Sequence, residues 1–166
     1  TKDGETKTEP VENGMVLIEN KTGKILSFVP GRDFRAGDRE FNFAFQATRS
    51  PGSTFKPLVY AAGFELGKLQ RVFADIPVSY GSYSPKNYGG AYYGLVTLRE
   101  ALTYSYNVTA VKAYYEIMND NPIDLFYSKM GYKSISSTEE AGNISFAIGG
   151  MDHGVTVEEN TGGFAT

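Results

Sequence analysis

Cysteine is absent from this 166-residue chain, and histidine occurs only once, at position 153. Without cysteine the chain forms neither disulfides nor thiolate metal sites, and a cysteine nucleophile is excluded. A zinc site usually needs several histidine or cysteine ligands, and a Ser-His-Asp triad would depend on His153 alone. We therefore expect no metal site built from histidine or cysteine, and we expect His153 to lie in a loop.

Long apolar runs and basic runs are also absent. No stretch approaches the roughly 18–20 apolar residues that span a bilayer, and the N-terminus lacks the regions of a signal peptide. The net charge of −3 comes from intermixed signs, so no basic run can follow a phosphate backbone, and nucleic acid is not expected as a partner. Because the chain starts at Thr1 and ends without a closing feature, we expect it to be part of a longer protein.

What the sequence does contain is the composition of a folded domain. Hydrophobic residues make up 41% of the chain, including 12 Tyr and 11 Phe, which is near globular usage. Residues 1–13 are polar and charged with little apolar periodicity, which predicts a flexible lead-in or linker. Residues 14–166 have the usual length of one domain and should bury a core of their own.

Local patterns in the first half predict a hairpin, a helix and a loop. Two β-rich runs at 15–19 and 24–29, separated by the turn residues 20–23, predict a β-hairpin. From Ser53, apolar residues at three-to-four-residue spacing predict a helix that stops at Gly67. Residues 72–93 contain prolines and glycines without sustained periodicity, which predicts a long ordered loop.

Helical patterns dominate the second half. Thr97 is expected to cap a helix, and the helical spacing resumes after a break near residues 105–107. A short helix is predicted over 122–130, and the capping-box spacing of 156–159 predicts another helix start. A hairpin followed mainly by helices predicts the α+β class, with helices packed on an antiparallel sheet.

Ser53 and Lys56 have the spacing of a serine nucleophile and its base. A serine hydroxyl becomes a good nucleophile when a base within hydrogen-bond reach takes its proton. Positions i and i+3 share one face of a helix, so the Lys56 amine can lie beside Ser53 Oγ. Burial would favour the neutral amine that this role requires. The same spacing also occurs by chance, with serine capping a helix and lysine pointing to solvent.

The flanks of this pair carry a specific resemblance. Residues 49–57, Arg-Ser-Pro-Gly-Ser-Thr-Phe-Lys-Pro, resemble the active-site serine segment of penicillin-binding proteins, whose motifs are Ser-x-x-Lys, Ser-x-Asn and Lys-Thr-Gly. Further stretches resemble class A-type, bifunctional members: residues 22–26, 31–34, 41–44, 85–90 and 94–102. The resemblance implies the α+β penicillin-binding/β-lactamase-like transpeptidase fold, with only its N-terminal part present and its C-terminal strands missing.

The second motif of this family matches residues 105–107. The resemblance implies that Ser53 is the nucleophile, that Lys56 is its base, and that Ser105 relays a proton to the leaving amine. The amide of Asn107 would bind the substrate's peptide backbone and orient Lys56, in addition to a role as helix cap. We therefore predict that these four side chains converge in one cleft.

The third motif, Lys-Thr-Gly, occurs only at residues 21–23, before Ser53. In the family the functional copy follows Ser-x-Asn, on a strand that edges the cleft. Asn-Lys-Thr-Gly between two β-rich runs is ordinary hairpin chemistry, so we interpret this copy as an exposed turn remote from Ser53. The family's strand supplies part of the substrate-carboxylate site and one oxyanion N–H, so this segment alone is expected to react slowly or not at all.

The resemblance implies a serine D,D-transpeptidase that crosslinks peptidoglycan through an acyl-enzyme on the extracytoplasmic face of the bacterial membrane, anchored outside this chain. The implied partners are the D-Ala-D-Ala end of a stem peptide, β-lactam antibiotics and the C-terminal remainder of the domain. A D,D-carboxypeptidase or serine β-lactamase shares Ser-x-x-Lys but sends water to the acyl-enzyme. A non-catalytic wall-binding or β-lactam-sensing module is the alternative from another class, which the missing third motif leaves open.

Overall fold

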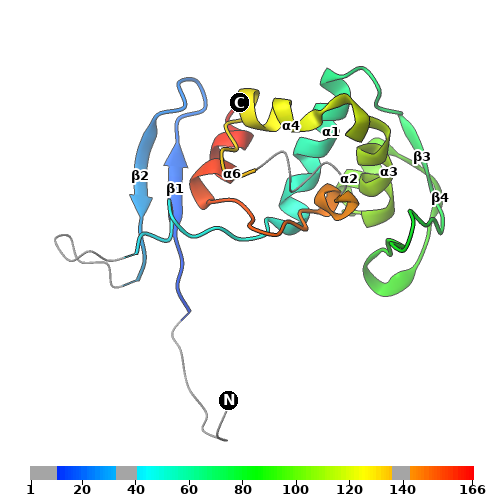
Figure 1. The fold of residues 1–166 in the computed structure, drawn as a ribbon, viewed down its shortest axis with the longest axis horizontal. Coiled ribbons are helices and arrows are strands. Elements are labelled where there is room, and N and C mark those ends of the chain that lie inside the picture. Colours follow the sequence, from blue (N-terminus) through cyan, green and yellow to red (C-terminus); the bar gives the residue numbers. More distant parts are fainter. Residues whose placement is uncertain (1–10, 33–40, 136–142) are drawn as a thin grey trace, which may run out of the picture.

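The computed structural model describes residues 11–32, 41–135 and 143–166. The predicted lead-in over residues 1–13 lies mostly outside this part, and residues 11–13 form neither helix nor strand. Within the described ranges, two small two-stranded sheets lie on opposite sides of a group of helices (Figure 1). The predicted α+β class is therefore confirmed.

The first sheet is the predicted hairpin. Strands β1 (Met15–Ile18) and β2 (Ile25–Val29) pair antiparallel, with Met15 opposite Val29. The turn closes through hydrogen bonds from Glu19 N to Lys24 O at 2.9 Å and from Gly23 N to Glu19 O at 2.8 Å. Gly23 has a φ of 68°, a left-handed conformation that glycine adopts without steric cost. Turn chemistry and two short β-rich runs thus form this element locally.

The second sheet corrects one prediction. Residues 72–93 were expected to form a loop, but Val72–Asp75 is strand β3, which pairs antiparallel with β4 (Gly94–Thr97). The register places Val72 opposite Thr97, so the whole intervening segment separates the two partners. A four-residue strand is too short to show a period, and its pairing is non-local, so the local pattern did not reveal it.

The predicted helices are present in the predicted order, together with short 3-10 turns that the sequence patterns did not predict. The bounds are η1 Gly52–Phe55, α1 Lys56–Glu65, η2 Tyr88–Gly90, α2 Leu98–Thr103, α3 Asn107–Ile117, η3 Met118–Asp120, α4 Pro122–Asp124, η4 Leu125–Lys129, η5 Ile144–Ile148 and α6 Val157–Phe164. The elements η1, η2, η3 and η5 are short 3-10 helices, whereas η4 is a short π-helix that continues α4. The break predicted near residues 105–107 separates α2 from α3.

Two helix caps predicted from the sequence are present. Thr97 Oγ1 accepts a hydrogen bond from Glu100 N at 3.2 Å at the start of α2. At the start of α6, Thr156 Oγ1 accepts from Glu159 N at 3.1 Å, and Glu159 Oε2 accepts from Thr156 N at 3.0 Å. This reciprocal pair is a capping box, which satisfies N–H groups that the first helical turn leaves without partners.

The main core forms where α1, α3 and η5 meet. Phe55, at the end of the η1 turn, is fully buried, and its ring centroid lies 4.8 Å from that of Phe146 and 5.1 Å from that of Phe126. Tyr114 on α3 also packs on Phe146, at 5.3 Å. Aromatic burial of this size fixes the position of η1 and of the start of α1.

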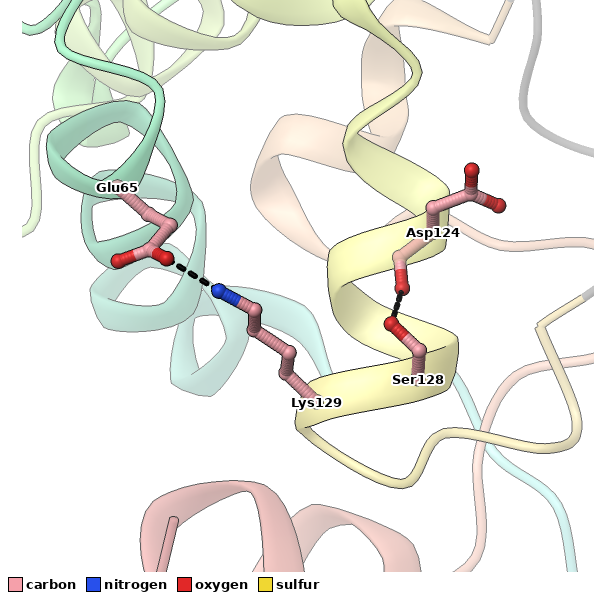
Figure 2. Close-up of polar contacts among 4 residues, drawn as sticks. All are labelled: Glu65, Asp124, Ser128 and Lys129. Carbon is pink, nitrogen blue, oxygen red and sulfur yellow. Dashed lines mark hydrogen bonds and ion pairs between the residues drawn. The ribbon is translucent and has the colours of Figure 1, made fainter.

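Surface contacts join the outer ends of α1 and η4. Lys129 forms an ion pair with Glu65, and Ser128 Oγ donates to the backbone oxygen of Asp124 one turn earlier (Figure 2). The hydrogen bond and charge of Lys129 hold the pKa of Glu65 below its usual value. Both partners of the ion pair are more than half exposed, so solvent screens the contact and we assign it little stabilising energy.

Candidate active site

Ser53 lies in the η1 turn that leads directly into α1. Its side chain is exposed, and its backbone oxygen accepts a hydrogen bond from Lys56 N. Gly52, immediately before it, has a φ of 57°, so the chain turns sharply where the sequence predicts a turn. The prediction that Ser53 opens a helix is confirmed, with the refinement that a 3-10 turn precedes α1.

The segment before Ser53 is clamped by a distant part of the chain. Arg49 and Val155 exchange two backbone hydrogen bonds, at 3.0 and 2.9 Å, and Ser50 Oγ donates to Met151 O at 3.0 Å. A Cβ at Gly149 would lie 2.3 Å from the backbone oxygen of Gly52, so only glycine allows this approach. Sequence reasoning missed this clamp, although adjacent glycines at 149 and 150 were a visible signal.

Lys56 is buried, and its amine is surrounded by oxygen atoms. The residue is 1% exposed, and Nζ donates to Ser105 O at 2.6 Å, to Ser105 Oγ at 2.9 Å and to Asn107 Oδ1 at 2.7 Å. Burial lowers the pKa of Lys56 from 10.5 to about 8, because desolvation disfavours the ammonium form. A substantial neutral fraction is therefore present at mildly alkaline pH.

Ser105 occupies the break between α2 and α3 in a strained conformation. Its φ of 56° lies in the left-handed region, which non-glycine residues adopt only rarely. Its N–H donates to Leu102 O at 3.1 Å, and its carbonyl and hydroxyl oxygens both face the Lys56 amine. Such strain persists only where the surroundings enforce it, and it is concentrated at functional sites.

The prediction that Asn107 caps α3 is wrong: Asn107 is the first residue of the helix, and its side-chain oxygen accepts from Lys56 instead of from the helix backbone. Its side chain is oriented by hydrogen bonds on both sides. Its Nδ2 donates to Lys86 O at 2.8 Å, which leaves Oδ1 to accept from Lys56. Its backbone N–H donates to Asn87 Oδ1 at 2.8 Å. One of its amide hydrogens is thus already engaged within the protein, and Asn87 is a further residue of the site that sequence reasoning did not single out.

The structure brings together three of the four predicted side chains. Lys56, Ser105 and Asn107 are joined directly by hydrogen bonds. Ser53 lies three residues before Lys56, but in the described part of the chain the three hydrogen bonds of the Lys56 amine go to Ser105 and Asn107 and not to the Ser53 hydroxyl. Catalytic hydrogen bonds are often long in a ligand-free site and tighten when substrate binds, so this geometry is compatible with the predicted pair.

The Lys-Thr-Gly copy at residues 21–23 lies in the hairpin turn. All three residues are exposed, and Thr22 Oγ1 donates to the carboxylate of Glu19. Helix α6 contacts β1 and lies between the hairpin and α1 (Figure 1). Residues 21–23 therefore occupy the exposed turn that the sequence predicts, and α6 separates their hairpin from α1.

Other candidate features add no second site. His153 lies in the loop between η5 and α6, as expected. The described residues hold no cluster of three or more His, Cys, Asp or Glu side chains placed to bind a metal ion. Of the helices in the described part of the chain, none has both the length and the apolar character needed to cross a membrane.

Comparison with known sequences identifies related proteins. The family model for the penicillin-binding protein transpeptidase domain matches residues 13–163. Penicillin-binding protein 1F of Bacillus subtilis is 35% identical over 158 residues, covering 93% of this chain and 21% of that protein. Penicillin-binding protein 1A of Neisseria meningitidis is 37% identical over 150 residues, covering 85% and 18%. The chain spans about a fifth of the length of these curated relatives.

Solved structures share the fold. Penicillin-binding protein 1A from Haemophilus influenzae matches with a TM-score of 0.74 and 26% identity, over 94% of this chain and 23% of that one. The imipenem acyl-enzyme complex of penicillin-binding protein A from M. tuberculosis matches with a TM-score of 0.74 and 24% identity, over 95% and 46%. The second match, at its lower identity, is evidence for the fold alone.

Proposed function

This chain belongs to the penicillin-binding protein transpeptidase family, and from that premise we propose that it carries the nucleophile of a serine D,D-transpeptidase that crosslinks peptidoglycan. The observation that carries the proposal is the buried Lys56 amine, held by Ser105 and Asn107 from 49 and 51 residues away. A lysine placed by chance beside a capping serine would point to solvent, whereas this one is 1% exposed.

The first step is acylation of Ser53. Its Oγ forms a bond to the carbonyl carbon of the penultimate D-Ala of a stem peptide, while the neutral Lys56 amine takes the hydroxyl proton. The peptide C–N bond then breaks, and the proton passes to the nitrogen of the leaving D-Ala. The N–H of Ser53, in the first turn of its helix, is available to stabilise the oxyanion.

The contacts of Lys56 explain how a neutral amine can be held in place. An ammonium group donates three hydrogen bonds, matching the three oxygens around Nζ. A neutral amine donates only two, to Ser105 O and Asn107 Oδ1, and its lone pair can accept either from the Ser105 hydroxyl at rest or from the Ser53 hydroxyl when acylation begins. The Ser105 hydroxyl is the only one of the three oxygens that can reverse its hydrogen bond, which suits it as the proton relay.

The second step returns the enzyme to its starting state. An amine on another stem peptide attacks the ester carbon, the bond from that carbon to Ser53 Oγ breaks, and the proton goes back to the serine oxygen. Penicillin would acylate the same oxygen, because a β-lactam resembles D-Ala-D-Ala. No metal or cofactor is required by these steps. The stem peptide, β-lactams and the remainder of the domain are therefore the proposed partners.

The active domain is proposed to include a C-terminal part that follows Ser-x-Asn and contributes its own Lys-Thr-Gly strand. The match to about a fifth of each curated relative supports this, as does the position of residues 21–23 in an exposed turn. The described segment supplies one oxyanion donor, and loss of one donor costs about 10²–10³ in rate in other hydrolases. We place the assembled protein on the extracytoplasmic face of the membrane.

Covalent labelling tests the proposal. The protein is prepared with this chain followed by the remainder of its domain, treated with penicillin and digested, and the peptides are weighed by mass spectrometry. We expect one adduct, on the peptide that contains Ser53, and none in Ser53→Ala. Ser27→Ala, a change of an exposed serine on β2, serves as the matched control and should label normally.

Other outcomes point to the alternatives. A folded protein that never labels would contradict acylation of Ser53 and favour a non-catalytic wall-binding or β-lactam-sensing module. Rapid labelling followed by rapid hydrolysis would favour a β-lactamase. Release of free D-Ala from a stem peptide without crosslinking would favour a D,D-carboxypeptidase, because the two enzymes differ in whether water or an amine resolves the ester.

A further inference from the structure

We infer that Asn87, held in place by Asp75, is a positioning residue that sets Ser105 and Asn107 around Lys56. The inference rests on the proposed function, because it concerns the same site. Neither Asp75 nor Asn87 belongs to the serine motifs, yet both polar side chains are buried, at 0% and 5% exposure. A buried polar group stabilises a protein only when it is hydrogen-bonded, so their partners indicate what they do.

The start of α3 is capped by Asn87 rather than by a neighbouring residue. The first N–H groups of a helix lack intrahelical partners, and the side chain of Tyr106 at the N-cap position makes no capping hydrogen bond to them. Asn87 Oδ1 accepts from Asn107 N at 2.8 Å and from Val108 N at 3.2 Å. The position of the Ser-x-Asn segment is therefore set by a residue of the preceding loop.

Asp75 fixes the orientation of the Asn87 amide. Asn87 Nδ2 donates to the two carboxylate oxygens of Asp75, at 2.9 and 2.8 Å, and to Ala91 O at 3.0 Å. A flipped amide would place its oxygen against the carboxylate, so Oδ1 must face α3. Asp75 also accepts from Tyr93 N at 2.9 Å, which ties strand β3 to the far end of the same loop.

The same loop orients the side chain that contacts Lys56. Lys86, the neighbour of Asn87, offers its carbonyl oxygen to Asn107 Nδ2, and this turns Asn107 Oδ1 toward Nζ. Two residues earlier, Ser105 holds its positive φ. The hydrogen bonds from Asn107 N and Val108 N to Asn87 fix the start of α3, and this constrains the strained backbone of Ser105 from its C-terminal side. Asn87 thus acts on Lys56 through Asn107 and Ser105, without touching it.

The first test is Asn87→Ala in the protein with a complete domain. Displacement of the Ser-x-Asn segment by about 1 Å should slow penicillin acylation about 10²-fold. Amide hydrogen exchange should accelerate at Asn107 and Val108, whose N–H groups lose their acceptor. Thr156→Ala is the matched control, because it removes a buried cap from α6, which bears none of these motifs. The control should lose stability and keep its acylation rate.

A rescue experiment separates positioning from general stability. Asn87→Asp alone places two carboxylates face to face and should be at least as slow as Asn87→Ala. Adding Asp75→Asn exchanges the two side chains, so an amide again donates to a carboxylate and a carboxylate oxygen again accepts from the start of α3. We expect this exchange to restore the acylation rate to within about tenfold of wild type, since most of the bonds return.

The inference and the proposed function fail in different ways. Wild-type protein that does not label contradicts the proposed function, while hydrogen exchange at Asn107 and Val108 still tests the inferred cap. Wild-type rates and unchanged exchange in Asn87→Ala would overturn the inference. It would also be overturned if Asn87→Ala lost no more activity than a Thr156→Ala control of equal stability, or if the exchanged pair stayed as slow as Asn87→Asp.

Discussion

Two lysines in this molecule lie in opposite surroundings, although the letters around each match a family motif. Lys56, in the helical core formed by α1, α3 and η5, is 1% exposed and donates to oxygens of Ser105 and Asn107. Lys21, in the β1–β2 hairpin, is exposed in a turn. The first lysine loses most of its hydration and gains fixed acceptors, whereas the second keeps its water.

The difference shows that the surroundings of a lysine, rather than the motif in which it stands, decide whether its amine can act as a base. Desolvation lowers the pKa of Lys56 to about 8 and so makes a neutral amine accessible. The hairpin has no comparable core: all five residues of β2 are exposed. Four tests, in order of decreasing expected effect, examine whether this contrast between the helical core and the hairpin holds in function and in stability.

The largest effect is expected from Lys56→Ala compared with Lys21→Ala. Loss of the base should slow penicillin acylation about 10²–10⁴-fold, the usual contribution of general acid–base catalysis. Lys21→Ala should label at the wild-type rate, because its side chain extends into solvent. Rates are measured with a fluorescent penicillin on the protein with a complete domain. Equal effects of the two changes would remove the distinction between the two lysines.

Next in size is the stability contrast between Phe55→Ala and Phe28→Ala. Phe55 is fully buried among aromatic rings, so its truncation should lower the free energy of unfolding by about 3–5 kcal/mol. Phe28 is 48% exposed and packs edge-on against Phe45, so the same truncation there should cost about 1 kcal/mol. Urea unfolding followed by circular dichroism measures both. A larger loss for Phe28→Ala would show that the hairpin holds part of the core.

Local sequence patterns predicted the hairpin turn and the helix caps, whereas strand β3 and the role of Asn87 depend on contacts between distant residues. The hairpin turn at Gly23 and the caps at Thr97 and Thr156 arise from neighbouring residues, so patterns a few residues long revealed them. Strand β3 was missed, because its partner lies beyond a long connection and four residues carry no period. The same explanation applies to Asn87, which caps a helix 20 residues further along the chain.

The site itself was predicted by family resemblance more than by local physics. Ser53 and Lys56 are one turn apart, and their spacing alone makes a shared helix face plausible. Nothing local places Ser105 beside Lys56, since 49 residues separate them. The left-handed backbone of Ser105 has no signature in a single sequence. The adjacent glycines at 149 and 150 are visible in the sequence, but their close approach to Gly52 is not, because it depends on packing between distant segments.

A smaller but graded effect is expected from pH. Below the pKa of about 8 for Lys56, the amine is an ammonium that cannot accept a proton, so acylation should fall about tenfold per pH unit as pH decreases. Above that value the rate should level off. The ordinary lysine pKa is 10.5, so a rate that still rises tenfold per unit up to pH 10 would mean that Lys56 is not desolvated in the folded protein. Acylation rates between pH 6 and pH 10 provide the measurement.

The smallest effect, and the sharpest test of the hairpin, is expected from Thr22→Ala. If residues 21–23 were the Lys-Thr-Gly strand that edges the cleft, loss of the threonine should impair acylation. Here Thr22 is exposed and donates to Glu19 in the same turn, so the change should leave the fluorescent-penicillin rate of the completed domain unchanged. The turn keeps its backbone hydrogen bond from Gly23 N to Glu19 O, and the melting temperature should fall by no more than about 3 °C. A large loss of acylation with normal folding would mean that residues 21–23 form the substrate strand after all, and that the hairpin belongs to the active site.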